Sequence, residues 1–215
     1  MVDPIKKILL KHPSNAFLNQ RNINKQYLEL NYLAAPNFNS AISDYEIFVD
    51  LLKSFDIEIY FLPKDKSTSL DSIYTHDPCV VSNKGVVICN MGKKARQPEA
   101  DSMKKFFHSI EVPILGKIQS PGTLEGGDVV WINEKTIAVG EGYRTNKEGI
   151  EQLKLLLSDQ VETVITVSIP HWNGPDDCLH LMSNLSPIDH NLYLVYSRLL
   201  PVSFIKYLLD QNIEL

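Results

Sequence analysis

The order of secondary structure predicted along this chain repeats, and the repeat constrains the fold more than any other feature. Residues 79–81 and 86–89 are short apolar runs on either side of a polar turn. Apolar side chains spaced three and four apart then predict a helix over residues 98–110, and residues 112–115 form another apolar run. This order predicts a ββαβ unit.

The same order returns along the chain. Strands are predicted at residues 128–132 and 136–139, a helix at 146–157 and a strand at 161–169. A third copy begins near Leu181, with a strand predicted at 192–196, a helix at 201–210 and the start of a strand at 212–215. A looser copy comes first in the chain, with a strand at 5–11, a helix at 40–54 and a strand at 57–62. Each unit has an apolar face that only a neighbour can bury, so we expect an array or ring of α/β modules.

The composition agrees with one folded domain over residues 1–215. Hydrophobic residues make up 44% of 215, which supports a buried core. Because the last predicted strand has just begun at residue 215, we expect the domain to be incomplete at its C-terminus.

Charge and cysteine content exclude several classes of protein. Lys and Arg total 21 against 26 Asp and Glu, so we expect neither a nucleic-acid partner nor an anionic membrane. Charges and a proline near the N-terminus are not typical of a signal peptide. Charges and a proline also interrupt the apolar region 192–209, so we expect no membrane span there. Three scattered cysteines favour a reducing, cytoplasmic location.

Two carboxylates precede the strand at residue 79. Asp77 stands before a proline, which biases its backbone toward the extended region, and Asp71 lies six residues earlier. Such a pair could grip a planar guanidinium, or it could stabilise a turn.

A second acidic motif leads into the strand at residue 128. Glu125 and Asp128 flank two glycines, which allow a close approach of backbone. The acids are either turn residues or placed catalytic carboxylates.

Arginines stand just before predicted helices. Arg96 precedes Pro98, and Arg144 precedes Thr145 and Glu148, which have the spacing of a capping box. An arginine beside a helix N-terminus can bind a carboxylate ligand. Because such arginines recur at similar places in the repeat units, they could instead have a structural role.

His180 has a thiol and two acids close by in the sequence. On a strand, Cys178 and His180 would point to the same face. They are either a nucleophile and its base or structural residues. The spacing of the histidines is not typical of metal ligands, so we expect no metal ion.

Taken in order, these motifs resemble the guanidino-group-modifying superfamily, with its arginine deiminases, amidinotransferases and dimethylarginine dimethylaminohydrolases. The matching stretches are Asp71–Pro78, Gly92–Glu99, Thr123–Val130, Gly140–Gly149 and Cys178–Ser183. The resemblance implies a pentein-type α/β propeller of five ββαβ modules, of which about four are expected here. It looks closest to the dimethylargininase-like hydrolases.

The resemblance also implies residue roles. Asp77 would hold the substrate guanidinium, Glu125 would orient His180, and His180 would be the general acid and base. Arg96 and Arg144 would bind the substrate carboxylate, with Asp71 at the amino-acid end. A cysteine thiolate would attack the guanidinium carbon, and water would release a ureido product such as citrulline. The resemblance implies that this chemistry needs neither a metal nor an organic cofactor.

The sequence departs from the family pattern at the nucleophile. The family cysteine follows the catalytic histidine in a glycine-rich stretch, and no cysteine follows His180 here. We therefore expect the nucleophile to be absent from this chain, with a separately encoded C-terminal segment or a homo-oligomer as a partner. The alternatives are a non-catalytic pentein-fold binding protein, a decayed enzyme and an unrelated metal hydrolase. His76 stands where relatives commonly have an arginine or an acid, which leaves the particular guanidino substrate open.

Overall fold

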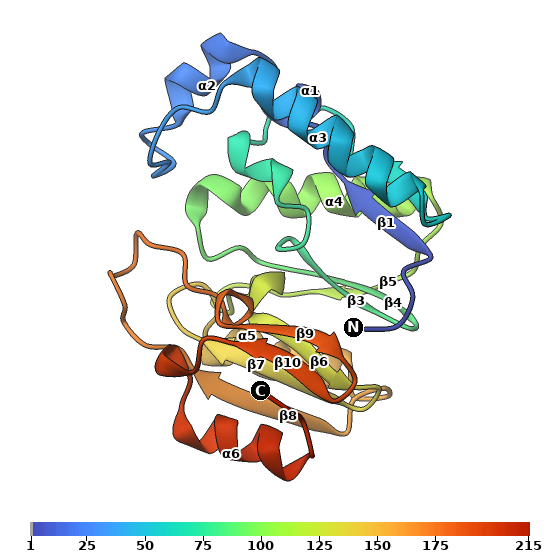
Figure 1. The fold of residues 1–215 in the computed structure, drawn as a ribbon, viewed down its shortest axis with the longest axis vertical. Coiled ribbons are helices and arrows are strands. Elements are labelled where there is room, and N and C mark those ends of the chain that lie inside the picture. The colour runs from blue at the N-terminus through green and yellow to red at the C-terminus, as the bar shows by residue number, and fades with distance from the viewer. Residues whose placement is uncertain (1) are drawn as a thin grey trace. The chain divides into compact units, whose positions relative to one another are not determined.

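The computed structural model describes residues 2–215 and divides into two compact units (Figure 1). Unit 1 contains residues 2–3, 76–92 and 112–215, and unit 2 contains residues 4–75 and 93–111. Each unit is described by itself.

Unit 1 contains the predicted ββαβ order in its sheets. Its first sheet has the order β3 (Cys79–Ser82), β4 (Gly85–Ile88) and β5 (Ile114–Lys117), and its second has β6 (Val129–Asn133), β7 (Thr136–Glu141) and β8 (Thr163–Ser168). In both sheets the first two strands are antiparallel and the third pairs parallel to the second. Helix α5 (Lys147–Leu156) makes the crossover between β7 and β8, as a parallel connection requires.

A third hairpin follows in unit 1. Strand β9 (Leu185–Asp189) is antiparallel to β10 (Leu192–Val195), and α6 (Val202–Asp210) comes next. Glu214 then forms an isolated parallel bridge with Leu192, at the place where the sequence predicted the start of a closing strand.

Unit 2 holds the looser copy. Strands β1 (Lys7–Leu10) and β2 (Glu58–Phe61) pair in parallel, and α3 (Phe38–Lys53) connects them. The unit also contains α1 (Pro13–Ala16) and α2 (Gln20–Gln26), which the sequence analysis did not predict, and α4 (Gln97–Ser109) from the loop between β4 and β5.

Two apolar clusters hold the sheets of unit 1 together. One packs β3, β4, β6 and β7 against α5 through residues such as Val87, Ile137 and Leu153. The other packs the sheet β6–β8 and the hairpin β9–β10 against α6, which lies alongside β8 in Figure 1. Fully burying one such aliphatic side chain contributes roughly 1.5–3 kcal/mol, so both clusters stabilise the fold of unit 1.

Three local predictions need correction. The strand expected at 112–115 lies at Ile114–Lys117, because Pro113 has no N–H for the ladder and precedes the strand. The expected Thr145–Glu148 capping box does not form, since Asn146 is the N-cap of α5 and its side chain accepts from the Gly149 N–H. Cys178 and His180 lie in a loop rather than on a strand.

Within residues 2–215, every helix is too short or too polar to cross a lipid bilayer.

Candidate active site

Four loops of unit 1 carry the side chains that the sequence singled out. Asp77 lies just before β3 and Glu125 just before β6, so they occupy equivalent places in consecutive modules. The Gly126 N–H donates to the Asp77 carbonyl at 2.7 Å, which ties these two loops together. Arg144 lies between β7 and α5, and His180 lies in the long connection that follows β8.

His180 is held between two carboxylates. Its Nε2 lies 2.9 Å from Oε2 of Glu125, and its Nδ1 lies 3.8 Å from Oδ1 of Asp77. All three side chains are largely buried, so the contacts are shielded from water. The pairing of Glu125 with His180 that the resemblance implied is therefore present as a geometric fact.

Glu125 has a second cationic partner in Arg144, whose Nη1 lies 3.3 Å from the same Oε2. A fully buried carboxylate needs such partners, because an unpaired buried charge is costly. The buried carboxylates of Asp77, Glu125 and Asp128 thus face two cationic side chains, those of Arg144 and protonated His180.

Opposing effects act on the pKa of His180. Burial lowers it, but the hydrogen bonds with Cys178 and Glu125 and the charges of Asp128 and Asp77 together raise the pKa of His180 to about 11. At neutral pH the imidazole is therefore protonated, which is the state needed to give a proton to a leaving amine.

Gly127 allows this close packing. A Cβ built at Gly127 would lie 2.4 Å from Nδ1 of His180 and 2.8 Å from Oδ1 of Asp77. The Gly127 N–H donates to that same Asp77 oxygen at 3.1 Å. Glycine is required here because its missing side chain leaves room for the two functional groups.

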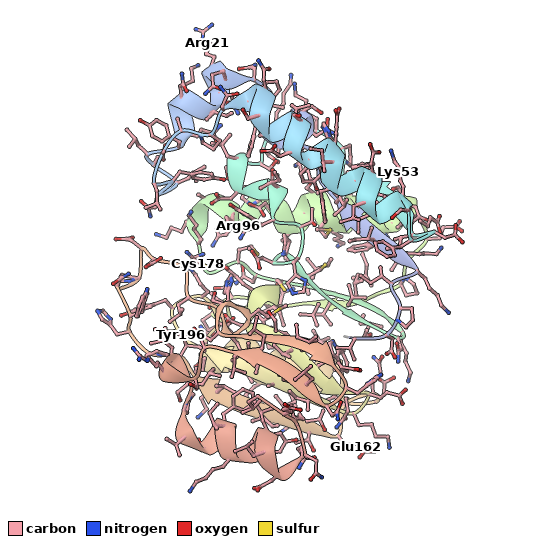
Figure 2. All side chains as sticks on the ribbon, in the orientation of Figure 1. Arg21, Lys53, Arg96, Glu162, Cys178 and Tyr196 are labelled. Atoms are coloured by element: carbon pink, nitrogen blue, oxygen red, sulfur yellow. The ribbon has the colours of Figure 1, made fainter. Side chains whose placement is uncertain are left out.

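The three cysteines differ sharply. Burial raises the pKa of Cys79 to about 12 and that of Cys89 well above its ordinary value, so both remain protonated and inert. Cys178 is exposed on the loop after β8 (Figure 2), and its Sγ lies 3.5 Å from Nδ1 of His180. The contact predicted between Cys178 and His180 exists, although in a loop.

Asp77, Glu125 and His180 are also the group of described residues that offers donor atoms for a metal ion. One donor atom from each lies within 4.8 Å of the others. Glu125 already accepts from His180 and Arg144, and a divalent ion beside the Arg144 guanidinium would be repelled by it. His180 and Arg144 therefore compete with a metal ion for the Glu125 carboxylate.

Asp71 and Arg96 belong to unit 2, where both have partners. Oδ2 of Asp71 lies 2.7 Å from Nζ of Lys93, which also donates to the Leu30 carbonyl at 3.0 Å. Arg96 (Figure 2) forms a buried ion pair with Glu99 at 2.8 Å, in the first turn of α4. The sequence analysis did not single out Lys93 or Glu99, and the carboxylate that faces Arg96 in the structure is Glu99.

Sequence reasoning also missed the connection between Asp128 and Thr145. The Thr145 hydroxyl donates to Oδ2 of Asp128 at 2.6 Å instead of capping α5. The signal available in the sequence was the Gly-Gly-Asp motif, in which Asp128 was interpreted only as a turn residue or a catalytic carboxylate. His76, next to Asp77, places its Nε2 3.1 Å from the Gly126 carbonyl.

A match to a known protein family agrees with the fold and with this group of side chains. The model of the arginine deiminase family matches residues 67–212, which is more than half of the chain. The chain therefore belongs to the arginine deiminase family, within the pentein superfamily that its motifs resemble.

Individual relatives show which characterised proteins this chain is similar to in sequence. N(G),N(G)-dimethylarginine dimethylaminohydrolase of Pseudomonas aeruginosa is 25% identical over 164 residues, which cover 76% of this chain and 61% of the relative. Arginine deiminase of Listeria welshimeri is 34% identical over 106 residues, covering 45% of this chain and 26% of the relative. The chain thus spans about three fifths or less of the length of these proteins.

Solved structures show the same fold. A dimethylarginine dimethylaminohydrolase adduct with 4-chloro-2-hydroxymethylpyridine has a TM-score of 0.70 at 23% identity, covering 89% of this chain and 68% of that one. The product-bound N-terminal domain of ArgZ, an arginine dihydrolase from cyanobacteria, has a TM-score of 0.75 at 16% identity, covering 97% and 72%. These similarities confirm the pentein-type α/β fold.

Proposed function

We propose that this chain binds a guanidino amino acid and provides the acid–base part of a hydrolase that cleaves guanidino C–N bonds. The observation that carries the proposal is the buried His180, held by Glu125 at 2.9 Å with Asp77 on its other side, in a chain of the arginine deiminase family. Relatives of this family include a dimethylargininase and arginine deiminases.

The electrostatics of unit 1 support a cationic ligand. Three buried carboxylates, those of Asp77, Glu125 and Asp128, lie in this part of unit 1, and Asp77 is the acid whose carboxylate reaches the Nδ1 side of His180. A guanidinium is planar and donates several N–H groups, so it suits a carboxylate such as Asp77. Roles for Arg144, Arg96 and Asp71 at the amino-acid end of the ligand belong to the same proposal.

The proposed chemistry proceeds in two steps. A thiolate attacks the guanidinium carbon and an S–C bond forms; the C–N bond breaks, and protonated His180 gives its proton to the leaving amine. Water then attacks the thiouronium carbon, so that the C–O bond forms and one water proton goes to His180. The C–S bond breaks to regenerate the thiolate, and the second water proton passes to the solvent as the neutral ureido product is released. In a transfer reaction, as in amidinotransferases, an amine acceptor would take the place of water in the second step.

The source of the thiol is part of the proposal. Cys79 and Cys89 are buried and protonated. Cys178 lies two residues before His180, and its Sγ is 3.5 Å from Nδ1 of His180, which leaves little room for a substrate between them. We therefore infer that the thiol comes from a segment outside these 215 residues, either in the same polypeptide or in a partner. The same proposal includes a domain of five modules, of which this chain supplies four, and a reducing location such as the cytoplasm.

Ligand binding to the chain tests the proposal without requiring turnover. We would measure thermal shift and calorimetric affinity with arginine, N-methylarginine and citrulline, using lysine as a cation without a guanidinium. A ligand at 100 times its Kd should stabilise the protein by about 2.7 kcal/mol. Asp77→Asn should abolish the shift, because it keeps the shape of the side chain and removes its charge.

A matched control is Asp159→Asn, which changes an exposed acid paired with Lys84 at the surface of unit 1. It should bind as the wild type does. The proposal fails if no guanidino ligand binds the wild type, or if lysine and arginine bind equally. Turnover by the chain alone that is lost in Cys178→Ser would overturn the inference that the thiol comes from outside.

A further inference from the structure

Asp128 is a buried acid for which neither the sequence motif nor the proposed chemistry supplies a role. It follows Gly127 and stands at the start of β6, with 2% of its surface exposed. It reaches no substrate group in the proposed chemistry, yet both of its carboxylate oxygens have partners from other loops.

The two oxygens connect separate segments of the chain. Oδ1 accepts from the backbone N–H of Leu181, the residue after His180, at 3.0 Å. Oδ2 accepts from the Thr145 hydroxyl at 2.6 Å, in the residue after Arg144. One carboxylate therefore anchors the loop of His180 and the loop of Arg144.

Thr145 extends this connection to the third loop. While its hydroxyl donates to Asp128, its Oγ1 accepts from the backbone N–H of Glu125 at 3.1 Å. The hydroxyl has one proton to donate, so its direction is determined by the acceptor at Asp128. The chain of contacts thus runs from Leu181 through Asp128 and Thr145 to Glu125.

The packing around the carboxylate leaves it little freedom. A Cβ at Gly140 would lie 2.8 Å from Oδ1 of Asp128, so the backbone of β7 approaches the carboxylate closely. A side chain held by hydrogen bonds on both oxygens and by backbone on one side keeps a single position, as the support of an active site requires.

The charge of Asp128 also acts on His180. Burial raises the pKa of Asp128 to about 6, and the charge of His180 and the hydrogen bonds from Thr145 and Leu181 oppose this rise. The groups that face His180 are Glu125, Asp77, Asp128 and Cys178. Above pH 6, ionised Asp128 therefore adds to the field that keeps the imidazole protonated.

We propose that Asp128 is a positioning residue, which holds the Glu125 loop through Thr145 and the His180 loop through the Leu181 N–H, so that Glu125 and His180 stay within hydrogen-bond distance. The inference rests on the proposed function for the guanidino ligand and for the role of His180 as the proton donor. It predicts two measurable properties, the pKa of His180 and the affinity for a guanidino ligand.

The test compares four variants of the whole chain: Asp128→Asn, Thr145→Val, Thr145→Ser and the surface control Asp159→Asn. The pKa of His180 is followed by NMR through its imidazole carbon and proton shifts. Asp128→Asn should lower that pKa by at least one unit, which is a tenfold loss of proton affinity. Thr145→Val keeps the charge of Asp128 but breaks the connection to Glu125, so it should lower the pKa less, while Thr145→Ser should restore the wild-type value.

The affinity for arginine provides a second readout. Asp128→Asn and Thr145→Val should each weaken binding at least tenfold, whereas Thr145→Ser and Asp159→Asn should leave it unchanged. If Asp128→Asn does not fold, the comparison of Thr145→Val with Thr145→Ser decides the question.

A purely structural role would give a different result. Melting temperatures would fall in Asp128→Asn and Thr145→Val while the pKa of His180 and the arginine affinity of the folded protein stayed at wild-type values, and that result would overturn the inference. If the wild type binds no guanidino ligand, the proposed function fails, but the pKa comparison still decides the role of Asp128.

Discussion

At the scale of single residues, the site depends on groups that are small or fully paired. Gly127 leaves the space in which His180 and Asp77 approach each other, and Glu125 is buried with two cationic partners. Both features follow from the same physical requirement. Polar groups packed at this density tolerate neither an added atom nor a missing partner.

Gly127→Ala should disturb the site more than it disturbs the fold. The added Cβ would lie 2.4 Å from Nδ1 of His180, so the ring must move away from Asp77. We expect at least a tenfold loss of affinity for guanidino ligands, measured by calorimetry, and an altered NMR shift of His180.

Gly174→Ala is the matched control for Gly127→Ala. Gly174 has a φ of +108°, so the substitution strains the backbone, but the new Cβ would meet no atom closer than 3.8 Å. It should lower the melting temperature and leave ligand affinity unchanged. Equal loss of affinity in both variants would mean that Gly127 contributes only to stability.

At the scale of elements, the ends of helices and strands determine where functional groups lie. The loops before β3 and β6 place Asp77 and Glu125 at equivalent positions, and the loop before α5 places Arg144. Asn146 stabilises that last loop because its Oδ1 accepts from the N–H groups of Gly149 and Thr123, each at 2.9 Å. The helix cap and the Arg144 loop are therefore one structure.

Asn146→Ala should cost about 1–2 kcal/mol of the free energy of unfolding, because it removes the cap of α5. Asn146→Asp keeps the acceptor and should cost less. Urea denaturation measures both.

The control for this prediction is Glu148→Gln, which changes the acid of the expected capping box. It should alter the free energy of unfolding by less than about 0.5 kcal/mol. A larger loss in Glu148→Gln than in Asn146→Ala would contradict the assignment of Asn146 as the cap.

At the scale of the whole molecule, the protonation of buried groups contributes to stability. The folded protein raises the pKa of His180 from 6.5 to about 11, so this group stabilises the fold fully below about pH 6.5. That contribution decreases as the pH rises through 11. Asp128 acts in a separate window: its pKa rises from 3.8 to about 6, so ionising it between these values lowers stability.

The free energy of unfolding of the wild type should therefore exceed that of His180→Gln at pH 6.5 and approach it as the pH rises toward 11. Urea denaturation of both proteins over this range isolates His180 from other titrating groups, because they are common to both. A difference that stayed constant with pH would contradict a raised pKa.

Local patterns were sufficient for most of the strands and longer helices. The apolar periodicity predicted both three-stranded units of unit 1, α6 and the strand–helix–strand order of unit 2 with small errors at the ends. It missed α1 and α2, whose seven or fewer residues leave too little periodicity to detect. It also placed the helix cap at Thr145 rather than Asn146, since both residue types cap helices and only the partners distinguish them.

Local sequence was enough to identify the residue types available for chemistry: the aspartate before β3, the Glu-Gly-Gly-Asp motif, the arginines before helices and His180. Their pairing depends on the folded structure, because a hydrogen bond between residues 55 apart in the chain, such as that of His180 with Glu125, leaves no local pattern. The same holds for Asp128 and Thr145, whose local sequences indicate a turn and a cap. Their partners come from other loops, and only the packing of the sheets brings those loops together.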